Sequence, residues 1–321
     1  MFRSRMQSIS SESVNESVAN STIFGPVSSR RFGVSLGIDL SPDTKSCNFD
    51  CLYCELPKAQ KTDTIQKPPK VDDVIADVKA ALLTHPQTEV ITITANGEPT
   101  LYPYLGELID AINAIKGERR LLILSNSSTL FRPEIQDALA KLDEVKLSLD
   151  CVTPGCFNKI DRPLDVEIPT IIDAIISFRT RFRGKLIIEI LLVSGINDTV
   201  TEFAAFRPVL ERIHPDRIDV GTIDRPPAYG VQAVPYEKIA LLCEALEGLP
   251  YHIVTKPGNS EAASYYSQEE ILNTFARRPF SQEDIERLFD EPSKENLAAL
   301  LAENRLERLE SGGKIFFHTK N

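Results

Sequence analysis

Three cysteines lie close together in the chain, at Cys47, Cys51 and Cys54. Spacings of four and then three positions allow one loop to gather three thiolates around a single inorganic cluster, and iron–sulfur clusters take thiolate ligands. Three local ligands leave one iron of such a cluster open to another ligand. A structural zinc site is the alternative, but it needs four ligands, and the next histidine along the chain is His85. The spacing therefore favours an iron–sulfur cluster.

Polar residues also follow three predicted strands. The turn Asn96-Gly97-Glu98-Pro99 comes after one apolar run, and Asn126 and Asp150 end the next two. Folds built on parallel strands bind their ligands at the carboxyl ends of those strands. A glycine there lets the backbone come close to a ligand, and a carboxylate or carbonyl oxygen accepts a hydrogen bond from an ammonium group. For each residue a plain turn or helix cap is the alternative.

With Tyr53 before its last cysteine, the C-x3-C-x2-C loop resembles the signature of the radical S-adenosylmethionine (SAM) superfamily. There, three cysteines hold a 4Fe-4S cluster, and SAM chelates the fourth iron. One electron then cleaves SAM to methionine and a 5′-deoxyadenosyl radical, which takes a hydrogen atom from the substrate. The resemblance implies Cys47, Cys51 and Cys54 as cluster ligands, and an electron donor of the flavodoxin or ferredoxin type.

The turn after the second strand resembles the G-G-E-P motif of that superfamily, which meets the SAM ammonium, with Asn96 in place of the first glycine. The resemblance also places a polar residue after the third strand on the SAM ribose. It thereby implies a set of SAM-binding candidates: Tyr53, Asn96, Gly97, Glu98, Asn126 and Asp150.

Over roughly residues 22–230 the chain is most similar to the uncharacterised and wyosine-related branch, on segments such as 25–33, 159–163 and 195–198. This similarity makes tRNA or another nucleotide the leading substrate, with a peptide or protein next. Archaeal wyosine-forming members carry a second cluster on N-terminal cysteines, and no cysteine precedes Cys47 here, so their activity is not carried over. Two alternatives stay open: an activase of glycyl-radical enzymes, and an iron–sulfur sensor that regulates transcription.

Apolar, β-branched runs alternate with helical-period stretches of 10–15 residues, a pattern typical of parallel strands covered by helices. Six clear strands are too few for a closed eight-stranded barrel. We therefore predict an α/β fold with a partial (β/α)6 TIM-like barrel over 22–256, after a flexible tail over 1–21. The predicted strands are Gly33–Asp39, Glu89–Thr94, Leu121–Ser125, Glu144–Leu149, Lys185–Val193 and Arg217–Thr222, with a weaker seventh at Tyr251–Val254. The predicted helices between them include Val71–Leu83, Tyr104–Ile115, Pro133–Leu142, Ile168–Arg181 and Pro235–Leu246.

The pattern changes after a linker at Lys256–Ser260. Ser267, Ser281 (with Asp284) and Ser293 are placed to cap three short helices. With a hairpin across Gly312-Gly313, these helices predict a small α+β winged-helix domain over 261–321. This segment has 8 Lys and Arg against 12 Asp and Glu. DNA binding needs a basic face, so we expect the domain to dock on the barrel or to recognise a protein.

The remaining features have two interpretations each. Cys151, Cys156 and Cys243 either bind a second cluster or are buried apolar residues. Arg30, Arg31, Arg162 and Arg225 either hold a substrate anion or pair with surface acids. Lys146 either faces the barrel interior or reaches solvent. The net charge of −10 disfavours non-specific nucleic-acid binding. The chain has no long apolar run, so we expect a cytoplasmic protein without a membrane segment.

Overall fold

The computed structural model describes residues 22–29, 32–254, 263, 265–277, 279–311 and 314–320. The predicted tail 1–21, the Lys256–Ser260 linker, Arg30, Arg31 and the Gly312-Gly313 turn lie outside these residues.

One eight-stranded sheet, in the order β1 to β8, forms the larger part of the molecule. Strand β1 (Ile23–Ser29) pairs antiparallel with β2 (Gly33–Asp39), and each later strand pairs parallel with its neighbour. Within the described residues no pairing joins β8 to β1, so the sheet is an open, partial barrel. The predicted α/β fold class is confirmed. The other strands are β3 (Val90–Thr94), β4 (Arg120–Ser125), β5 (Glu144–Ser148), β6 (Lys185–Leu192), β7 (Arg217–Thr222) and β8 (Tyr251–Ile253).

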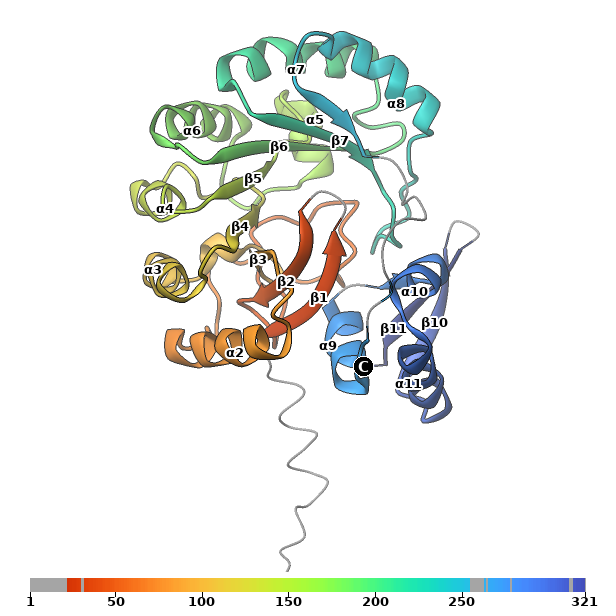
Figure 1. Cartoon of the computed structure of the whole chain (residues 1–321). Coiled ribbons are helices and arrows are strands. Elements are labelled where there is room, and N and C mark those ends of the chain that lie inside the picture. Colours follow the sequence, from red (N-terminus) through yellow and green to blue (C-terminus); the bar gives the residue numbers. More distant parts are fainter. Residues whose placement is uncertain are drawn as a thin grey trace, which may run out of the picture.

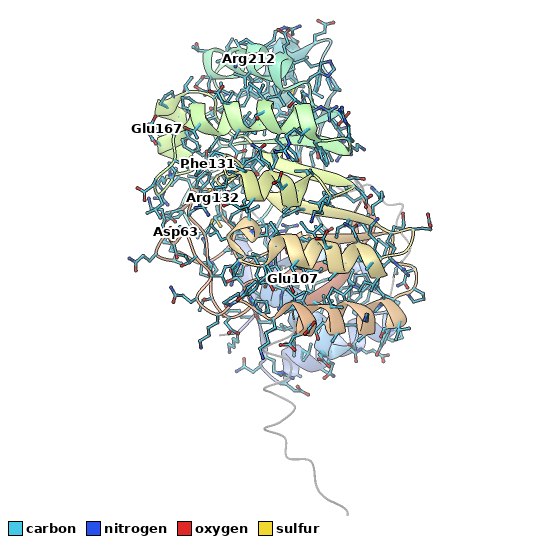
Figure 2. All side chains as sticks on the ribbon, turned by 90° about the vertical axis from the view of Figure 1, so that its left-hand side faces the viewer. Asp63, Glu107, Phe131, Arg132, Glu167 and Arg212 are labelled. Atoms are coloured by element: carbon cyan, nitrogen blue, oxygen red, sulfur yellow. A yellow bond between two sulfur atoms is a disulfide. The ribbon has the colours of Figure 1, made fainter. Side chains whose placement is uncertain are left out.

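Helices cover the convex outer side of this curved sheet (Figure 1). In α6 (Ile168–Arg181) the residues Ile171, Ile175 and Phe178 recur at helical spacing and are buried, so this apolar stripe packs on the sheet. The opposite side of the helices carries exposed charges such as Glu107 and Arg212 (Figure 2). None of the described helices has the length and hydropathy of a membrane span. The other helices around the sheet are α2 (Val71–Thr84), α3 (Leu105–Ile115), α4 (Pro133–Leu139), α5 (Pro154–Ile160), α7 (Val200–Ile213) and α8 (Tyr236–Cys243).

Strand β1 and helices α5 and α7 are not among the elements predicted from the sequence. Gly25-Pro26 interrupts β1, and proline cannot donate to a sheet ladder, so its pattern does not read as a strand. Strand β1 tolerates this proline because it lies at the edge of the sheet. Helix α7 contains Pro208, and α5 begins with Pro154-Gly155, a turn-like pair.

The C-terminal unit contains α9 (Gln268–Arg277), β9 (Phe280–Ser281), α10 (Gln282–Leu288), α11 (Glu291–Ala302), β10 (Leu306–Ser311) and β11 (Lys314–Thr319). Its three strands form a second sheet in the order β10-β11-β9, around a hydrophobic core separate from that of the barrel. These elements agree with the predicted three helices and hairpin, and the winged-helix assignment stays a prediction.

The C-terminal unit packs beside β1 (Figure 1). The backbone N–H of Gly25 donates to Thr274 Oγ1 at 3.3 Å, and the Tyr266 hydroxyl donates to the carbonyl of Pro26 at 2.8 Å. Both bonds use backbone groups on the open edge of β1. Helix α9 therefore covers an edge that would otherwise present unpaired polar groups.

Candidate functional site

The three cysteines of the predicted cluster lie in the loop that follows β2. Cys47, Cys51 and Cys54 are each half-buried. Within the described residues, one group of three Cys, His or acidic residues has ligand atoms that all lie within 4.8 Å of one another, and it does not contain these cysteines. At least one Sγ–Sγ distance among Cys47, Cys51 and Cys54 is therefore longer than 4.8 Å. A single zinc ion needs tightly gathered thiolates, with Zn–S bonds of about 2.3 Å. The wider spacing fits a larger cluster better than one ion.

Backbone hydrogen bonds hold the cysteine loop from several sides. Ser46 N donates to the carbonyl of Asn96 at 2.8 Å, and Glu98 N donates to the carbonyl of Ser46 at 2.9 Å. Further along, Leu52 N donates to the carbonyl of Ile160 at 2.8 Å, at the end of α5. Ala228 N donates to the carbonyl of Cys54 at 2.8 Å. Segments far apart in the sequence thus fix the loop before any ligand binds.

The thiols lie where ionisation is costly. Burial raises the pKa of Cys47 to about 12, and burial with nearby acidic groups raises the pKa of Cys51 well above its ordinary value. Positive and N–H groups approach the sulfurs: Lys45 Nζ lies 3.3 Å from Cys54 Sγ, and Asn126 Nδ2 lies 3.6 Å from Cys47 Sγ. Thiolates in such a site need further positive charge, which the irons of a cluster would supply. The residues present therefore fit the cluster.

The turn after β3 presses against the cysteine loop. Gly97 has a φ of +135°, and a Cβ there would lie 1.9 Å from the carbonyl oxygen of Ser46, so this position requires glycine. Beside it, Asn96 Oδ1 is a buried acceptor that has no hydrogen-bond partner among the described residues. Since a buried acceptor without a partner is costly, Asn96 fits a ligand that brings a donor, such as the SAM ammonium.

Glu98 faces into the protein. Its side chain is buried, and Oε1 accepts hydrogen bonds from Thr100 N at 3.0 Å and Ser125 Oγ at 2.8 Å. Oε2 accepts from the backbone N–H of Asn126 at 2.6 Å. Burial raises the pKa of Glu98, and these hydrogen bonds oppose that rise. The carboxylate predicted as a SAM contact thus joins the β3 turn to the residues after β4.

The structure pairs two candidates that the sequence treats separately. The Tyr53 hydroxyl donates to Asp150 Oδ2 at 2.5 Å, and Asp150 Oδ1 accepts from Leu191 N at 2.7 Å. Burial raises the pKa of Asp150 to about 7. Asn126 Nδ2 also donates to Asn48 Oδ1, at 3.1 Å, within the cysteine loop. Asp150 and Asn126 therefore hold the loop at its Tyr53 end and its Cys47 end.

A cavity of about 370 Å³ opens on the inner side of the sheet, next to Asn96 and Gly97. This volume is within the range of small-ligand sites, about 300–1,000 Å³. Its apolar wall includes Phe24, Phe32 and Leu122.

Ion pairs line the same cavity. Lys146 faces the interior, where it pairs with Glu189 and lies 3.4 Å from Asp219. Two further pairs are Arg225–Glu55 at 2.9 Å and Arg277–Asp39 at 3.1 Å.

Asp39, Glu55 and Arg277 line this cavity but were not predicted as site residues. Asp39 ends a strand as Asp150 does, so the same signal points to it. Arg277 comes from the C-terminal unit, and no local sequence pattern predicts that it lines the cavity.

Other predicted residues lie outside this cavity. Arg162 pairs with Asp50 at 2.6 Å, which agrees with the alternative that it meets an acidic neighbour. Cys151 and Cys156 form a disulfide, and Cys243 is buried in α8. Within the described residues these three cysteines do not form one ligand group.

Comparisons with known proteins agree with this geometry. Residues 41–206 match the model of the radical SAM superfamily. A UPF0026 protein of Helicobacter pylori is 38% identical over 299 residues, which cover 92% of this chain and 96% of that protein. The chain belongs to the radical SAM superfamily. The sequence prediction of this family is confirmed, and so is the prediction that the protein is an enzyme.

Two solved radical SAM structures share the fold. A radical SAM methyltransferase from Sphaerobacter thermophilus has a TM-score of 0.55 at 16% identity, covering 70% of this chain and 67% of that one. Streptococcus suis SuiB bound to S-adenosylmethionine has a TM-score of 0.52 at 16% identity, covering 66% of this chain and 49% of that one. Radical SAM membership implies SAM and a 4Fe-4S cluster as the cofactors of this chain.

Proposed function

We propose that this enzyme cleaves SAM reductively at a 4Fe-4S cluster held by Cys47, Cys51 and Cys54. One observation carries the proposal: the loop with the three half-buried thiols is hydrogen-bonded at Ser46 to the Asn96-Gly97 turn, which borders the cavity. When bound, the cluster and SAM supply a one-electron cleavage that yields methionine and a 5′-deoxyadenosyl radical.

Each side chain of the site has a role in this proposal. Asn96 Oδ1 would accept a hydrogen bond from the SAM ammonium, and Gly97 lets the turn come close to the Ser46 carbonyl of the cysteine loop. Lys45 and Asn126 direct N–H groups at the sulfurs of Cys54 and Cys47. Glu98, Tyr53 and Asp150 act as positioning residues, because their polar atoms bond to the elements that carry the loop and the turn. Ribose contacts would come from the residues around Asn126.

The substrate follows from the branch resemblance. We propose tRNA or another nucleotide first, and a peptide second. The cavity supports a substrate with both apolar and charged parts, because Phe24 and Phe32 line it together with the Arg225–Glu55 pair. A flavodoxin- or ferredoxin-type protein would supply the electron. The barrel over 22–256 would carry the chemistry in the cytoplasm, and the winged-helix-like unit over 261–321 would dock on it and leave DNA unbound.

The test is anaerobic reconstitution with iron and sulfide, followed by SAM and dithionite, with 5′-deoxyadenosine measured by mass spectrometry. Wild-type protein should form 5′-deoxyadenosine, and Cys51→Ala should not. Cys243→Ala is the matched control, because Cys243 is buried in α8, away from the cysteine loop, and it should leave the yield unchanged. A wild-type protein that holds the cluster but forms no 5′-deoxyadenosine, with or without a tRNA mixture, would contradict the proposal.

A further inference from the structure

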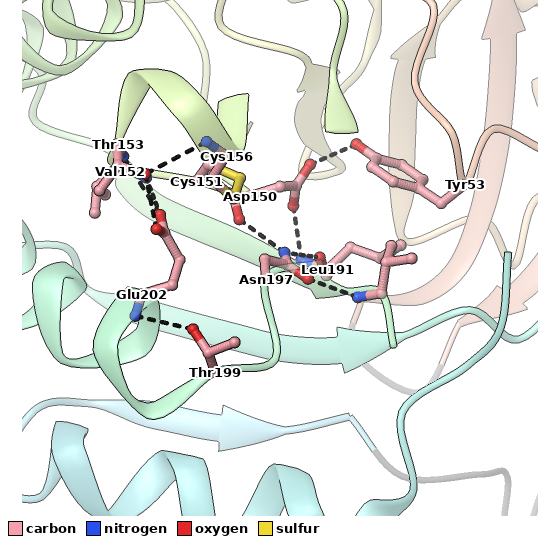
Figure 3. The surroundings of a disulfide bond; sticks show 11 residues. Tyr53, Asp150, Cys151, Val152, Thr153, Cys156, Leu191, Asn197, Thr199 and Glu202 are labelled. Carbon is pink, nitrogen blue, oxygen red and sulfur yellow. Dashed lines mark hydrogen bonds between the residues drawn. A yellow bond between two sulfur atoms is a disulfide. The ribbon is translucent and has the colours of Figure 1, made fainter. Parts of the chain in front are cut away.

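Two cysteines and a glutamate meet just beyond β5, outside the cluster loop. Cys151 directly follows Asp150, Cys156 lies in α5, and Glu202 lies in the first turn of α7. The two cysteines form a disulfide with Cα atoms 5.7 Å apart (Figure 3). One ligand atom from each of the three residues lies within 4.8 Å of the other two.

The glutamate is held at this place by its neighbours. Glu202 Oε2 accepts a hydrogen bond from Thr153 Oγ1 at 2.7 Å, and Oε1 accepts from the Val152 N–H at 3.3 Å (Figure 3). Both donors lie in the short segment between the two cysteines. The carboxylate is therefore directed at the cysteine pair, and it keeps lone pairs for a further partner.

The disulfide is uncharged, whereas each cysteine of the reduced pair can ionise to a thiolate. The proposed cluster chemistry needs strongly reducing conditions, and reducing compartments keep thiols reduced. Once reduced, two thiols and a carboxylate share one confined site, where ionised groups of like charge are unfavourable unless a cation compensates them. Thiolates select zinc among the common divalent ions, and three protein ligands leave its fourth position to water.

We propose that Cys151, Cys156 and Glu202 bind one zinc ion, separate from the cluster, when the cysteines are reduced. The inference rests on the proposed function only for the reducing conditions. Reduction transfers two electrons and two protons to the disulfide from a dithiol, which becomes a disulfide itself. Zinc binding then forms two Zn–S bonds and releases the two thiol protons.

The site also touches the proposed active site. Asp150, next to Cys151, accepts the hydrogen bond from Tyr53 of the cysteine loop, and the last residue of α5, Ile160, accepts one from Leu52. A zinc ion would therefore tie β5, α5 and α7 together behind the loop.

The experiment measures metal content in the cluster-loaded protein. Wild type is reduced anaerobically with a dithiol, desalted, given a small excess of zinc and desalted again, and iron and zinc per chain are counted by plasma mass spectrometry. We expect about one zinc ion per chain in wild type, none in Cys156→Ser, and unchanged iron in both. Cys51→Ala should lose iron and keep the zinc, which separates this site from the cluster loop.

Two further variants test whether a loss of zinc comes from the site itself and not from misfolding. Glu202→Gln preserves the side-chain shape and should weaken zinc binding about tenfold or more in chelator competition. Cys243→Ala should bind zinc as wild type does. Cobalt in place of zinc should give a thiolate-to-metal charge-transfer band in wild type that Cys156→Ser lacks.

Equal zinc in wild type and Cys156→Ser would overturn the proposal, and so would loss of zinc in Cys51→Ala. A cysteine pair that stays oxidised after reduction and takes up no zinc would do the same. None of these results bears on 5′-deoxyadenosine formation, so failure of the zinc site and failure of the proposed function are distinguishable.

Discussion

At the residue scale, the buried Glu98 supports the candidate site indirectly, through hydrogen bonds to the residues around it. Its carboxylate accepts hydrogen bonds from Thr100, which follows β3, and from Ser125 and Asn126, at the end of β4. Glu98→Gln places an amide NH2 against these donors. Because a buried group that loses its partner costs about 1–3 kcal/mol, the free energy of unfolding should fall by about that amount.

Anaerobic urea unfolding measures this loss. Glu107→Gln, on the exposed side of α3, is the matched control and should change the free energy of unfolding by less than about 0.5 kcal/mol. Equal effects of the two substitutions would mean that the Glu98 network contributes nothing to stability.

Asp150 predicts a pH dependence. Burial raises its pKa to about 7, against about 3.9 in an unfolded chain. Between about pH 4 and 7, Asp150 therefore holds a proton in the folded protein that it releases in the unfolded chain. The stability that the protonated form provides is complete below about pH 4 and is lost as the pH rises through about 7.

Asp150→Asn removes this titration. Relative to the variant, wild type should lose up to about 1.4 kcal/mol of unfolding free energy per pH unit between about pH 4 and 7, and little more above pH 8. Unfolding of both proteins from pH 5 to 8 tests this. A difference between wild type and variant that does not change with pH would show that Asp150 is ionised in the folded protein throughout.

At the scale of elements, the turn between β3 and the 3-10 helix Pro99–Leu101 sets the position of the cysteine loop. Gly97→Ala adds a Cβ against the carbonyl of Ser46 and a side chain at a positive φ, a backbone conformation that costs about 1–3 kcal/mol. We expect the loop to move, and both iron content and 5′-deoxyadenosine formation to fall at least about tenfold.

Gly155→Ala is the control for this substitution. Gly155 lies in α5, and a Cβ there would have no tertiary neighbour within 4 Å in the described part of the chain. Its iron content and activity should match those of wild type. If Gly97→Ala behaved in the same way, the close approach of the turn to the loop would not matter for the cluster.

Elements with a strong local pattern were predictable from the sequence. Strands β2 and β7 and helix α6 have the predicted bounds, and Ser281 forms the predicted capping box with Asp284. Prediction from local sequence patterns failed where a proline lies inside an element, as in β1 and α7. These patterns also misplaced one cap: Ser293 was the expected start of a helix, but α11 begins earlier and its cap is Asp290, whose side chain accepts from the Ser293 N–H at 2.9 Å.

The residues of the candidate site were likewise predictable only where they belong to a local motif. The cysteine loop and the Asn96-Gly97 turn are contiguous motifs, so both could be proposed as site residues from the sequence alone. The Tyr53–Asp150 hydrogen bond joins residues 97 positions apart, and no local pattern contains it. Such pairs depend on how the sheet curves, which periodicity does not encode.

At the scale of the whole molecule, a buried ion pair connects the C-terminal unit to the centre of the barrel. Arg277, at the end of α9, pairs with Asp39, at the end of β2, and their side chains are 12% and 2% exposed. Asp39 Oδ1 also accepts hydrogen bonds from Ser41 N and from the backbone N–H of Asn96, at 2.9 and 2.8 Å. The C-terminal unit thus supports the residue that holds the proposed SAM turn.

Arg277→Met would leave the Asp39 carboxylate buried without its guanidinium partner. Breaking a buried pair in this way costs about 3–5 kcal/mol, so the free energy of unfolding should fall by about that amount. The KM for SAM should rise as well, because Asp39 anchors Asn96. Arg212→Met is the matched control: Arg212 is 61% exposed, and its loss should cost less than about 0.5 kcal/mol.

A double-mutant cycle separates the pair from general damage. If Asp39 and Arg277 act through each other, Asp39→Asn and Arg277→Met combined should destabilise the protein by clearly less than the two single effects added together, by about 0.5–3 kcal/mol. Additive losses and an unchanged KM for SAM would instead mean that the C-terminal unit is only tethered to the barrel. The coupled result would make that unit a part of the catalytic site, since it would hold Asn96 through a single buried carboxylate.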